Sequence, residues 1–230
     1  ASMATPRAAV LSAPGALRVE PLPRCALGPH EVRVRVDLAG VCGTDLALFN
    51  GTLASSLPLV LGHEFVGTVI EAASPRDERW LGRRVCADIN FTCLSRREAA
   101  PCRACRLGMP HHCQRHTVMG IVQAPGAFAD ELIVPAENLF AVPNNVPDVR
   151  AVFVEPLAAA IEAFEQRPLT PREVVVVLGA GRLGALIAAV ARRLGADVLA
   201  VGRSRERLER LAALGVERRL TGDDASVCAE

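Results

Sequence analysis

The first 150 residues show the hydrophobic pattern of many short strands. Polar and apolar residues alternate from 30 to 40, as in a strand with one buried face. Further strand-like runs at 64–73, 82–88 and 127–134 are separated by turns that contain glycine or proline. This pattern predicts a small β-barrel or β-sandwich.

After residue 150 the pattern changes to alternating helices and strands. Residues 151–166 predict a helix, in which Pro156 is tolerated only in the first turn. A continuous apolar run at 173–178 predicts a strand buried on both faces. The remaining elements are a helix at 184–195 ended by Gly195, a strand at 197–202, an amphipathic helix at 203–215 with Leu208, Leu211 and Leu214 on one face, and a strand at 216–220. This order predicts a parallel sheet with right-handed crossovers, and we expect one domain at 1–150 and a second at 151–230.

The composition argues against several classes of function. The net charge is +1, from 26 basic and 25 acidic residues, which gives no reason to expect binding to nucleic acid or to a membrane surface. No apolar run reaches the roughly 18 residues that a membrane-spanning helix needs. The first residues do not resemble a signal peptide, so we expect a cytoplasmic protein.

Between the first strand and helix of the second domain stands the sequence GAGRLG, with Gly179, Gly181 and Gly184. In this position the first glycine permits a tight turn, the second lets the backbone approach a pyrophosphate, and the third allows close packing of helix and strand. The helix N-terminus, with Arg182 and Leu183, would stabilise the phosphate charge. We therefore predict a dinucleotide site, the alternative being a glycine-rich turn without a ligand.

The end of the next strand favours NADP over NAD. The acidic residue that would bind the ribose 2′-hydroxyl of NAD is absent there, and the chain reads Arg203, Ser204, Arg205. These side chains suit a 2′-phosphate, with Arg203 as the first candidate. In the alternative interpretation Ser204 is only the helix N-cap, and the arginines belong to a solvated face with ion pairs between Arg205 and Glu209 and between Glu206 and Arg210.

Upstream, three short motifs contain metal-ligand residue types: CGTD at 42–45, GHE at 62–64 and VEPLA at 154–158. Together with the cysteine run at 102–113 and GAGRLG, and in this order, they resemble the zinc-dependent medium-chain alcohol dehydrogenases, in their polyol-dehydrogenase-like branch. The resemblance covers essentially the whole chain. It implies a GroES-like β-barrel catalytic domain followed by a partial Rossmann domain, and hydride transfer between an alcohol or polyol and NADP(H).

The resemblance also implies a catalytic zinc site. Cys42 and His63 would be ligands, with Glu155 as the third, bound directly or through water. Glu64 would lie close behind, as an alternating ligand or as a carboxylate that supports the ligands without binding the metal. Asp45 would orient His63 through its other ring nitrogen, and Thr44 would bind the alcohol and pass on its proton. Ala47 stands where many members carry a relay histidine, which puts brisk activity on primary alcohols in doubt.

A second zinc is expected in a lobe at about 93–113. The family's usual spacing has four cysteines, and Cys102, Cys105 and Cys113 match the last three. Ala99 occupies the usual first position, so we predict that Cys93 is the fourth ligand, displaced by an insertion of six residues. Extra loop length costs little closure entropy. His111, His112 and His116 are the rival ligands. Clustered cysteines in a reducing compartment favour metal over disulfides.

The sequence contains three of the roughly six strands that the family's dinucleotide domain has. We therefore expect it to be part of a longer enzyme, homo-oligomeric in its full-length form, and to turn over little by itself. Two other interpretations stay open. One is a zinc-free quinone-reductase-like enzyme on the same fold, and the other is a non-catalytic nucleotide-binding protein with only a structural zinc.

Overall fold

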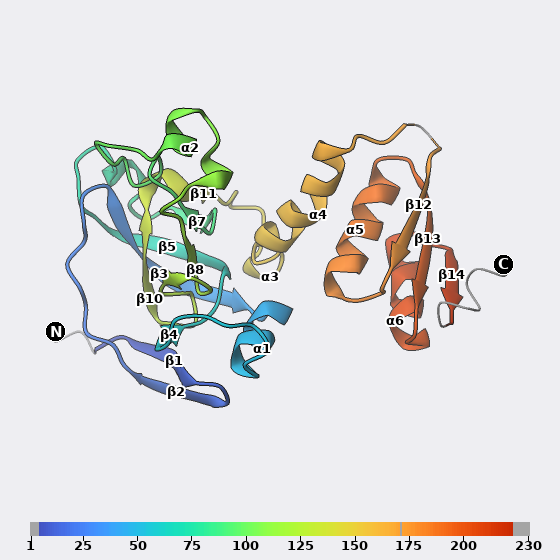
Figure 1. Cartoon of the computed structure of the whole chain (residues 1–230), viewed down its shortest axis with the longest axis horizontal. Helices are drawn as coiled ribbons and strands as arrows, with labels where there is room; N and C mark the ends of the chain where they lie inside the picture. The colour runs from blue at the N-terminus through green and yellow to red at the C-terminus, as the bar shows by residue number, and fades with distance from the viewer. Residues whose placement is uncertain (1–4, 171, 223–230) are drawn as a thin grey trace. The chain divides into compact units, whose positions relative to one another are not determined.

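The computed structural model describes residues 5–170 and 172–222. These form two compact units, the first ending at Glu155 and the second beginning at Pro156 (Figure 1). Helix α4 (Val154–Gln166) runs across this division, and Pro156 lies in its first turn as predicted. Each unit is described by itself below.

The first unit is built from strands, as the alternating pattern predicts. Its main sheet has the order β10-β3-β5-β6-β11, formed by Glu131–Pro135, Glu31–Gly40, Glu64–Ala72, Arg84–Ala87 and Leu139–Ala141. All four pairings in this sheet are antiparallel. Alternate residues such as Val32, Val34 and Val69 point into the core of the unit and are almost completely buried.

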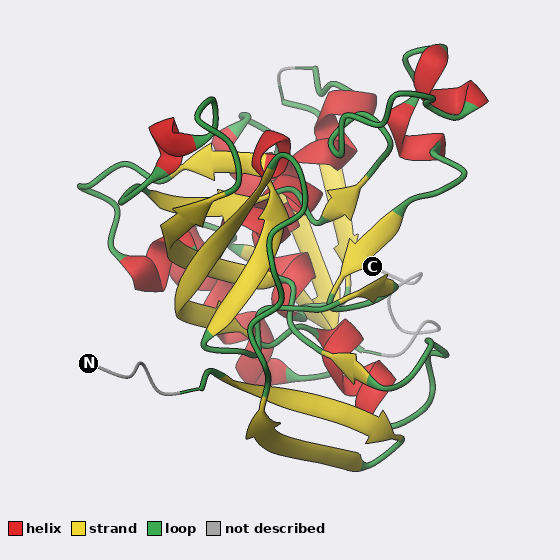
Figure 2. Cartoon of the chain, turned by 90° about the vertical axis from the view of Figure 1, so that its left-hand side faces the viewer, coloured by secondary structure: helices red, strands yellow, loops and turns green. Residues whose placement is uncertain are grey.

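Two small sheets and several short helices complete this unit. One sheet has the order β2-β1-β4 (Ala16–Pro21, Arg7–Ala13, Leu59–Val60), and its hairpin projects at the bottom of the unit in Figures 1 and 2. The other has the order β7-β8-β9 (Asn90–Phe91, Thr117–Met119, Gln123–Ala124). The helices are α1 (Gly43–Phe49), α2 (Arg103–Arg106) and α3 (Asp148–Ala151), with 3₁₀ turns at Glu78–Trp80, Pro110–His112 and Ala136–Asn138.

The second unit has the predicted parallel sheet, β12-β13-β14 (Val174–Leu178, Asp197–Gly202, Arg218–Thr221). The crossover helices are α5 (Arg182–Arg193) and α6 (Arg205–Arg210), the latter continued by a 3₁₀ turn at Leu211–Leu214. Both helices lie on one face of the sheet (Figure 1) and share a core with its strands. Gly195, with φ of 91°, ends α5 as predicted, because glycine adopts this left-handed conformation without strain.

Two expectations for this unit are wrong. Strand β12 is not buried on both faces, since Val174, Val176 and Leu178 are 51–77% exposed. Both described crossovers place their helices on the same face, so only the alternate residues of β12 are covered. Leu214 does not share the buried face of Leu208 and Leu211 and is 44% exposed. The tighter 3₁₀ turn that begins at Leu211 rotates it away from the position it would have in an α-helix.

The described helices include none that has both the length and the apolar character needed to cross a bilayer.

Candidate functional site

Cys42 and Asp45 are placed by the start of helix α1. Cys42 follows the end of β3 and occupies the N-cap of α1 with extended backbone. Asp45 lies three residues later, so its carboxylate turns back toward the helix start, and Oδ2 accepts a hydrogen bond of 2.8 Å from the Cys42 N–H. This is the local geometry of an N-terminal capping interaction, and it fixes the direction of the Cys42 side chain.

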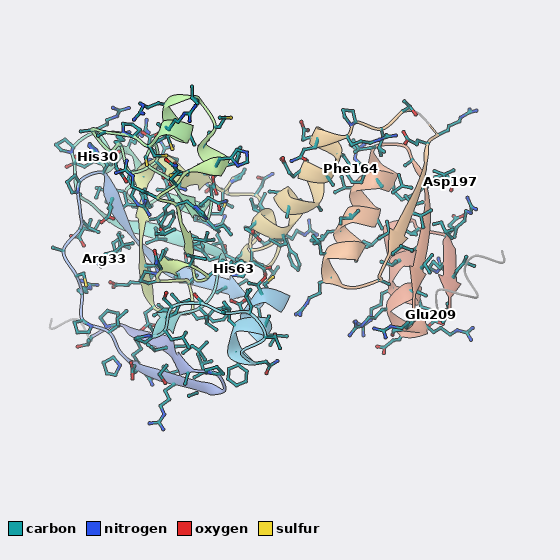
Figure 3. The ribbon with its side chains drawn as sticks, in the orientation of Figure 1. His30, Arg33, His63, Phe164, Asp197 and Glu209 are labelled. Atoms are coloured by element: carbon teal, nitrogen blue, oxygen red, sulfur yellow. The ribbon has the colours of Figure 1, made fainter. Side chains whose placement is uncertain are left out.

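The same carboxylate reaches the loop that carries His63. Oδ1 of Asp45 accepts a hydrogen bond of 3.2 Å from the N–H of Gly62 and lies 3.5 Å from Nδ1 of His63. His63, labelled in Figure 3, and Asp45 are both buried. Burial of the imidazole lowers its pKa, but the nearby carboxylate of Asp45 and, after it, the thiol of Cys42 outweigh this and raise the pKa of His63 to about 9. Asp45 therefore joins two loops that are distant in sequence.

Cys42, His63 and Glu64 form a compact set of metal-ligand types. Ligand atoms of the three side chains all lie within 4.8 Å of one another. The hydroxyl of Thr44 lies 3.7 Å from the sulfur of Cys42, at the edge of this set. A thiol, an imidazole and a carboxylate at this separation fit a zinc ion with a remaining position for another group.

Glu155 is near this set but is not one of its three members. Glu155 is the second residue of α4 and is half-buried. Burial raises the pKa of its carboxyl group, the positive charge of His63 opposes this, and the charge of Glu64 adds to it. Glu64 is thus the carboxylate that lies within 4.8 Å of the ligand atoms of both Cys42 and His63, and Glu155 is a second carboxylate whose charge interacts with His63.

Several glycines, of which the sequence analysis named only Gly62 as part of its GHE motif, make this arrangement possible. Gly40 faces Glu64 across the β3–β5 pair, and a Cβ at Gly40 would overlap the Glu64 carboxylate. Gly62 has φ of 95°, and its carbonyl oxygen lies where a Cβ of Gly120 or Gly126 would be. The close approach of the backbone segments at Gly62, Gly120 and Gly126 holds the loop that carries His63 in place. An isolated glycine in a strand pattern, such as Gly40, is the sequence signal for this kind of approach.

The four predicted lobe cysteines come together in the structure. Sulfur atoms of Cys93, Cys102, Cys105 and Cys113 lie within 4.8 Å of one another, and all four side chains are buried. The backbone N–H groups of Cys105 and Gln114 hydrogen-bond the sulfur of Cys102 and lower its pKa to about 6. Among the described residues no histidine joins this group, and His116 instead bonds the Cys113 carbonyl oxygen at 2.8 Å. Four clustered thiols fit a closed zinc site.

The glycine fingerprint lies at the C-terminal end of β12, where the chain passes into α5. Gly179 has φ of 105°, and Gly181 is the N-cap of α5. Gly184 packs so closely that a Cβ would overlap the carbonyl oxygen of Gly179. A cavity of about 560 Å³ opens here, lined by Gly179, Ala180, Gly181, Gly202, Arg203, Ser204 and Arg207. Arg182 lines an adjoining cavity, and Leu183 is 48% exposed.

The three residues predicted to bind a 2′-phosphate have different positions. Arg203 lines the cavity, whereas Arg205 forms an ion pair of 3.1 Å with Glu209 and is not among the residues that line it. Ser204 caps α6, since its hydroxyl accepts a hydrogen bond of 3.4 Å from the N–H of Arg207. Arg207, which the sequence analysis missed, lines both cavities beside the fingerprint. Arg207 lies in the first turn of α6, the helix that Ser204 caps, and this position is the signal that could have identified it.

Comparison with known proteins gives the family. Residues 28–144, half of the chain, match the family model for the alcohol dehydrogenase GroES-like domain. An L-threonine 3-dehydrogenase from Edwardsiella ictaluri (strain 93-146) is 35% identical over 203 residues, which are 86% of this chain and 57% of the relative. The chain thus spans a little over half the length of that relative.

Two solved structures extend the likeness over the described fold. A protein described as a zinc-binding dehydrogenase from Sinorhizobium meliloti 1021, bound to NADP, is 29% identical with a TM-score of 0.85, covering 97% of this chain and 63% of that one. A protein described as a short chain alcohol dehydrogenase (rspB) from Escherichia coli CFT073, complexed with NADH, is 28% identical with a TM-score of 0.87, covering 98% of this chain and 65% of that one. The chain therefore belongs to the zinc-dependent alcohol dehydrogenase-like family, with a GroES-like domain followed by part of a Rossmann domain.

Proposed function

We propose that this protein interconverts an alcohol and its carbonyl compound by hydride transfer with NADP(H). The observation that carries the proposal is the compact set of Cys42, His63 and Glu64, with Asp45 bonded to both of the loops that supply it. A zinc ion bound there would act as a Lewis acid and lower the pKa of a bound alcohol. Glu155, half-buried nearby, is the further carboxylate available to the same ion.

The residues of the chain would bind and orient the substrate. Thr44 holds its hydroxyl 3.7 Å from the Cys42 sulfur, where it could hydrogen-bond an alcohol oxygen, accept its proton and pass the hydroxyl proton on to water or the cofactor ribose. Ala47 offers no group that could relay this proton further. Relatives named L-threonine 3-dehydrogenase act on a secondary alcohol, and we propose a secondary alcohol or polyol as the substrate class.

For the cofactor, we propose NADP in preference to NAD. The cavity beside Gly179 and Gly181 is lined by two arginines, Arg203 and Arg207, and by the hydroxyl of Ser204. Guanidinium groups suit a 2′-phosphate, and the strand end has no carboxylate that would suit a free 2′-hydroxyl. The second zinc of the proposal is structural and is held by Cys93, Cys102, Cys105 and Cys113.

Metal content tests the two sites separately. We expect two zinc ions per purified chain, one after His63→Ala and one after Cys93→Ser. His112→Ala, which changes an exposed histidine beside the lobe, is the matched control and should keep both. Alcohol oxidation is assayed with NADP in the 230-residue chain and in any longer form that contains it. Full turnover in the His63→Ala variant would refute the catalytic assignment.

A further inference from the structure

Strand β2 is the outer strand of its small sheet. The strand order is β2-β1-β4, and among the described strands β2 pairs with β1 alone. Figure 1 shows β2 as the outermost strand at the bottom of the first unit. Every residue of β2 after Ala16 is exposed, and the exposed fraction is 40% for Leu17 and 58% for Val19. An edge strand of this kind offers its unpaired backbone groups to another strand.

Two hydrogen bonds of β1 and β2 show which backbone groups face the free edge. The N–H of Leu22 donates to the carbonyl oxygen of Pro6 at 2.7 Å, so these two residues form a hydrogen-bonded pair of the antiparallel ladder. The N–H of Ala9, which lies opposite Val19, donates instead to a carbonyl oxygen outside β2 at 2.7 Å. Because hydrogen-bonded and non-hydrogen-bonded pairs alternate, the N–H and C=O groups of Val19 and of Leu17 point outward.

The side chains of β2 carry a pattern that is complementary to itself. Leu17, Val19 and Pro21 lie on one face of the strand, because side chains alternate along it. Arg18 and Glu20 lie on the opposite face, and neither side chain has a hydrogen-bond or ion-pair partner among the described residues. An antiparallel copy of the same strand would bring an opposite charge to each of them.

The charges select one register for such a pairing. If Val19 of one copy lies opposite Val19 of the other, Arg18 lies opposite Glu20 of the second copy. That charged pair is a non-hydrogen-bonded one, in which facing side chains approach most closely. Moving the pairing by two residues in either direction would place Arg18 opposite Arg18 or Glu20 opposite Glu20, and like charges directly opposite destabilise a strand pair.

We propose that β2 is a self-association surface, at which two copies of this chain pair antiparallel across a two-fold axis between their Val19 residues. Arg18 of each copy then faces Glu20 of the other, and the two hairpins form one continuous sheet. The N–H of Val19 donates to the Val19 carbonyl oxygen of the second copy, and that of Leu17 donates to the Pro21 carbonyl oxygen. Pro21 has no N–H, so the ladder ends there. The inference is independent of the zinc and dinucleotide sites.

The test reverses the charges of β2 one at a time and then together. Sedimentation equilibrium of the unchanged 230-residue chain, with a reductant that keeps the exposed Cys25 from forming disulfides, should show a monomer–dimer equilibrium. Arg18→Glu and Glu20→Arg each set like charges opposite one another and should raise the dimer Kd by about 10-fold or more. Arg150→Glu, which reverses an exposed arginine on α3, is the matched control and should leave the Kd unchanged.

Two further samples test the pairing itself. In the double variant Arg18→Glu/Glu20→Arg, opposite charges face each other again, and the Kd should return close to that of the unchanged chain. An equimolar mixture of the two single variants should form mixed dimers, which native mass spectrometry distinguishes by mass, because every facing pair in them has opposite charges. Thermal unfolding checks that each variant is folded.

Each outcome decides the proposal. Weaker association in both single variants, with recovery in the double variant and in the mixture, supports it. A chain that stays monomeric over the whole concentration series overturns it, and Arg18 and Glu20 then keep the edge from pairing. Association that survives both single reversals overturns it as well, because another surface must then carry the contact. Loss without recovery in the double variant also overturns it, because the two charges do not then face each other.

Discussion

Oδ1 of Asp45 lies 3.5 Å from Nδ1 of His63, and each side chain is only 3% exposed. The other carboxylate oxygen accepts the N–H of Cys42 at 2.8 Å. One buried carboxylate thus fixes both the imidazole and the backbone beside the thiol, and it leaves Nε2 of His63 as the ring nitrogen for a metal. Partners of this kind set the orientation and basicity of a ligating histidine.

The first prediction concerns the charge of Asp45. In the metal-free chain the His63 ring should titrate near pH 9, as followed by NMR. Asp45→Asn removes the largest of the influences that raise this pKa, so the midpoint should fall clearly below 9, with burial lowering it further and Cys42 still raising it. Asp37→Asn, which changes a carboxylate bonded to Thr68 on the main sheet, is the control. An unchanged midpoint in Asp45→Asn would contradict the role assigned to this pair.

The same pair makes the stability of the metal-free fold depend on pH. The folded-state pKa of His63 lies above its ordinary value, so the protonated ring stabilises the fold fully below about pH 6.5. This contribution is lost as the pH rises through about 9. Urea unfolding of the metal-free chain should show the decline between these values, and Asp45→Asn should show a smaller one.

The second prediction concerns the space above Gly40. A methyl group there would overlap the Glu64 carboxylate, so Gly40→Ala should displace Glu64 from Cys42 and His63. We expect zinc affinity at this site to fall by about 10-fold or more, as measured by competition with a chelator. Gly43→Ala is the matched control, because a Cβ at Gly43 meets no atom within 4 Å. Equal affinities in the two variants would exclude Glu64 as a ligand.

The third prediction concerns the lobe. Cys93→Ser should remove the fourth thiolate and with it the tightly held structural zinc. The Tm should fall, and each 1 kcal/mol of lost stability corresponds to roughly 2–4 °C for a chain of this size. Cys25→Ser, which changes an exposed cysteine, should alter neither zinc content nor Tm. Retention of both zinc ions in Cys93→Ser would show that another residue is the ligand.

The fourth prediction concerns the arginines at the dinucleotide cavity. Arg203→Ala and Arg207→Ala should each weaken binding of adenosine 2′,5′-bisphosphate by about 10–100-fold, the effect of losing a charged hydrogen bond. Binding of adenosine 5′-monophosphate, which lacks the 2′-phosphate, should change little. Arg205→Ala should affect neither ligand, because Arg205 is paired with Glu209. Isothermal calorimetry measures all four proteins, and equal losses for both ligands would refute a 2′-phosphate site.

The sequence by itself determined the elements and most of the chemistry. Alternation predicted the strand at β3, and β-branched runs predicted the parallel strands, because these signals depend on neighbouring residues. The fourth lobe cysteine was also predictable, since Cys93 is near its partners in sequence and a loop of eight residues closes readily. Ser204 as an N-cap, left open as an alternative, is confirmed by its bond to the N–H of Arg207.

Only the tertiary structure decided which side chains meet. Glu64 joins Cys42 and His63 in the compact set, because the β3–β5 register places Glu64 opposite Gly40. Arg207 lines the cavity in which Arg205 was expected, because the helix start turns one side chain toward the glycine loop and the other toward Glu209. The first contact depends on the register of two paired strands, and the second on the direction in which each side chain leaves the helix. No local pattern of residue types encodes either of them.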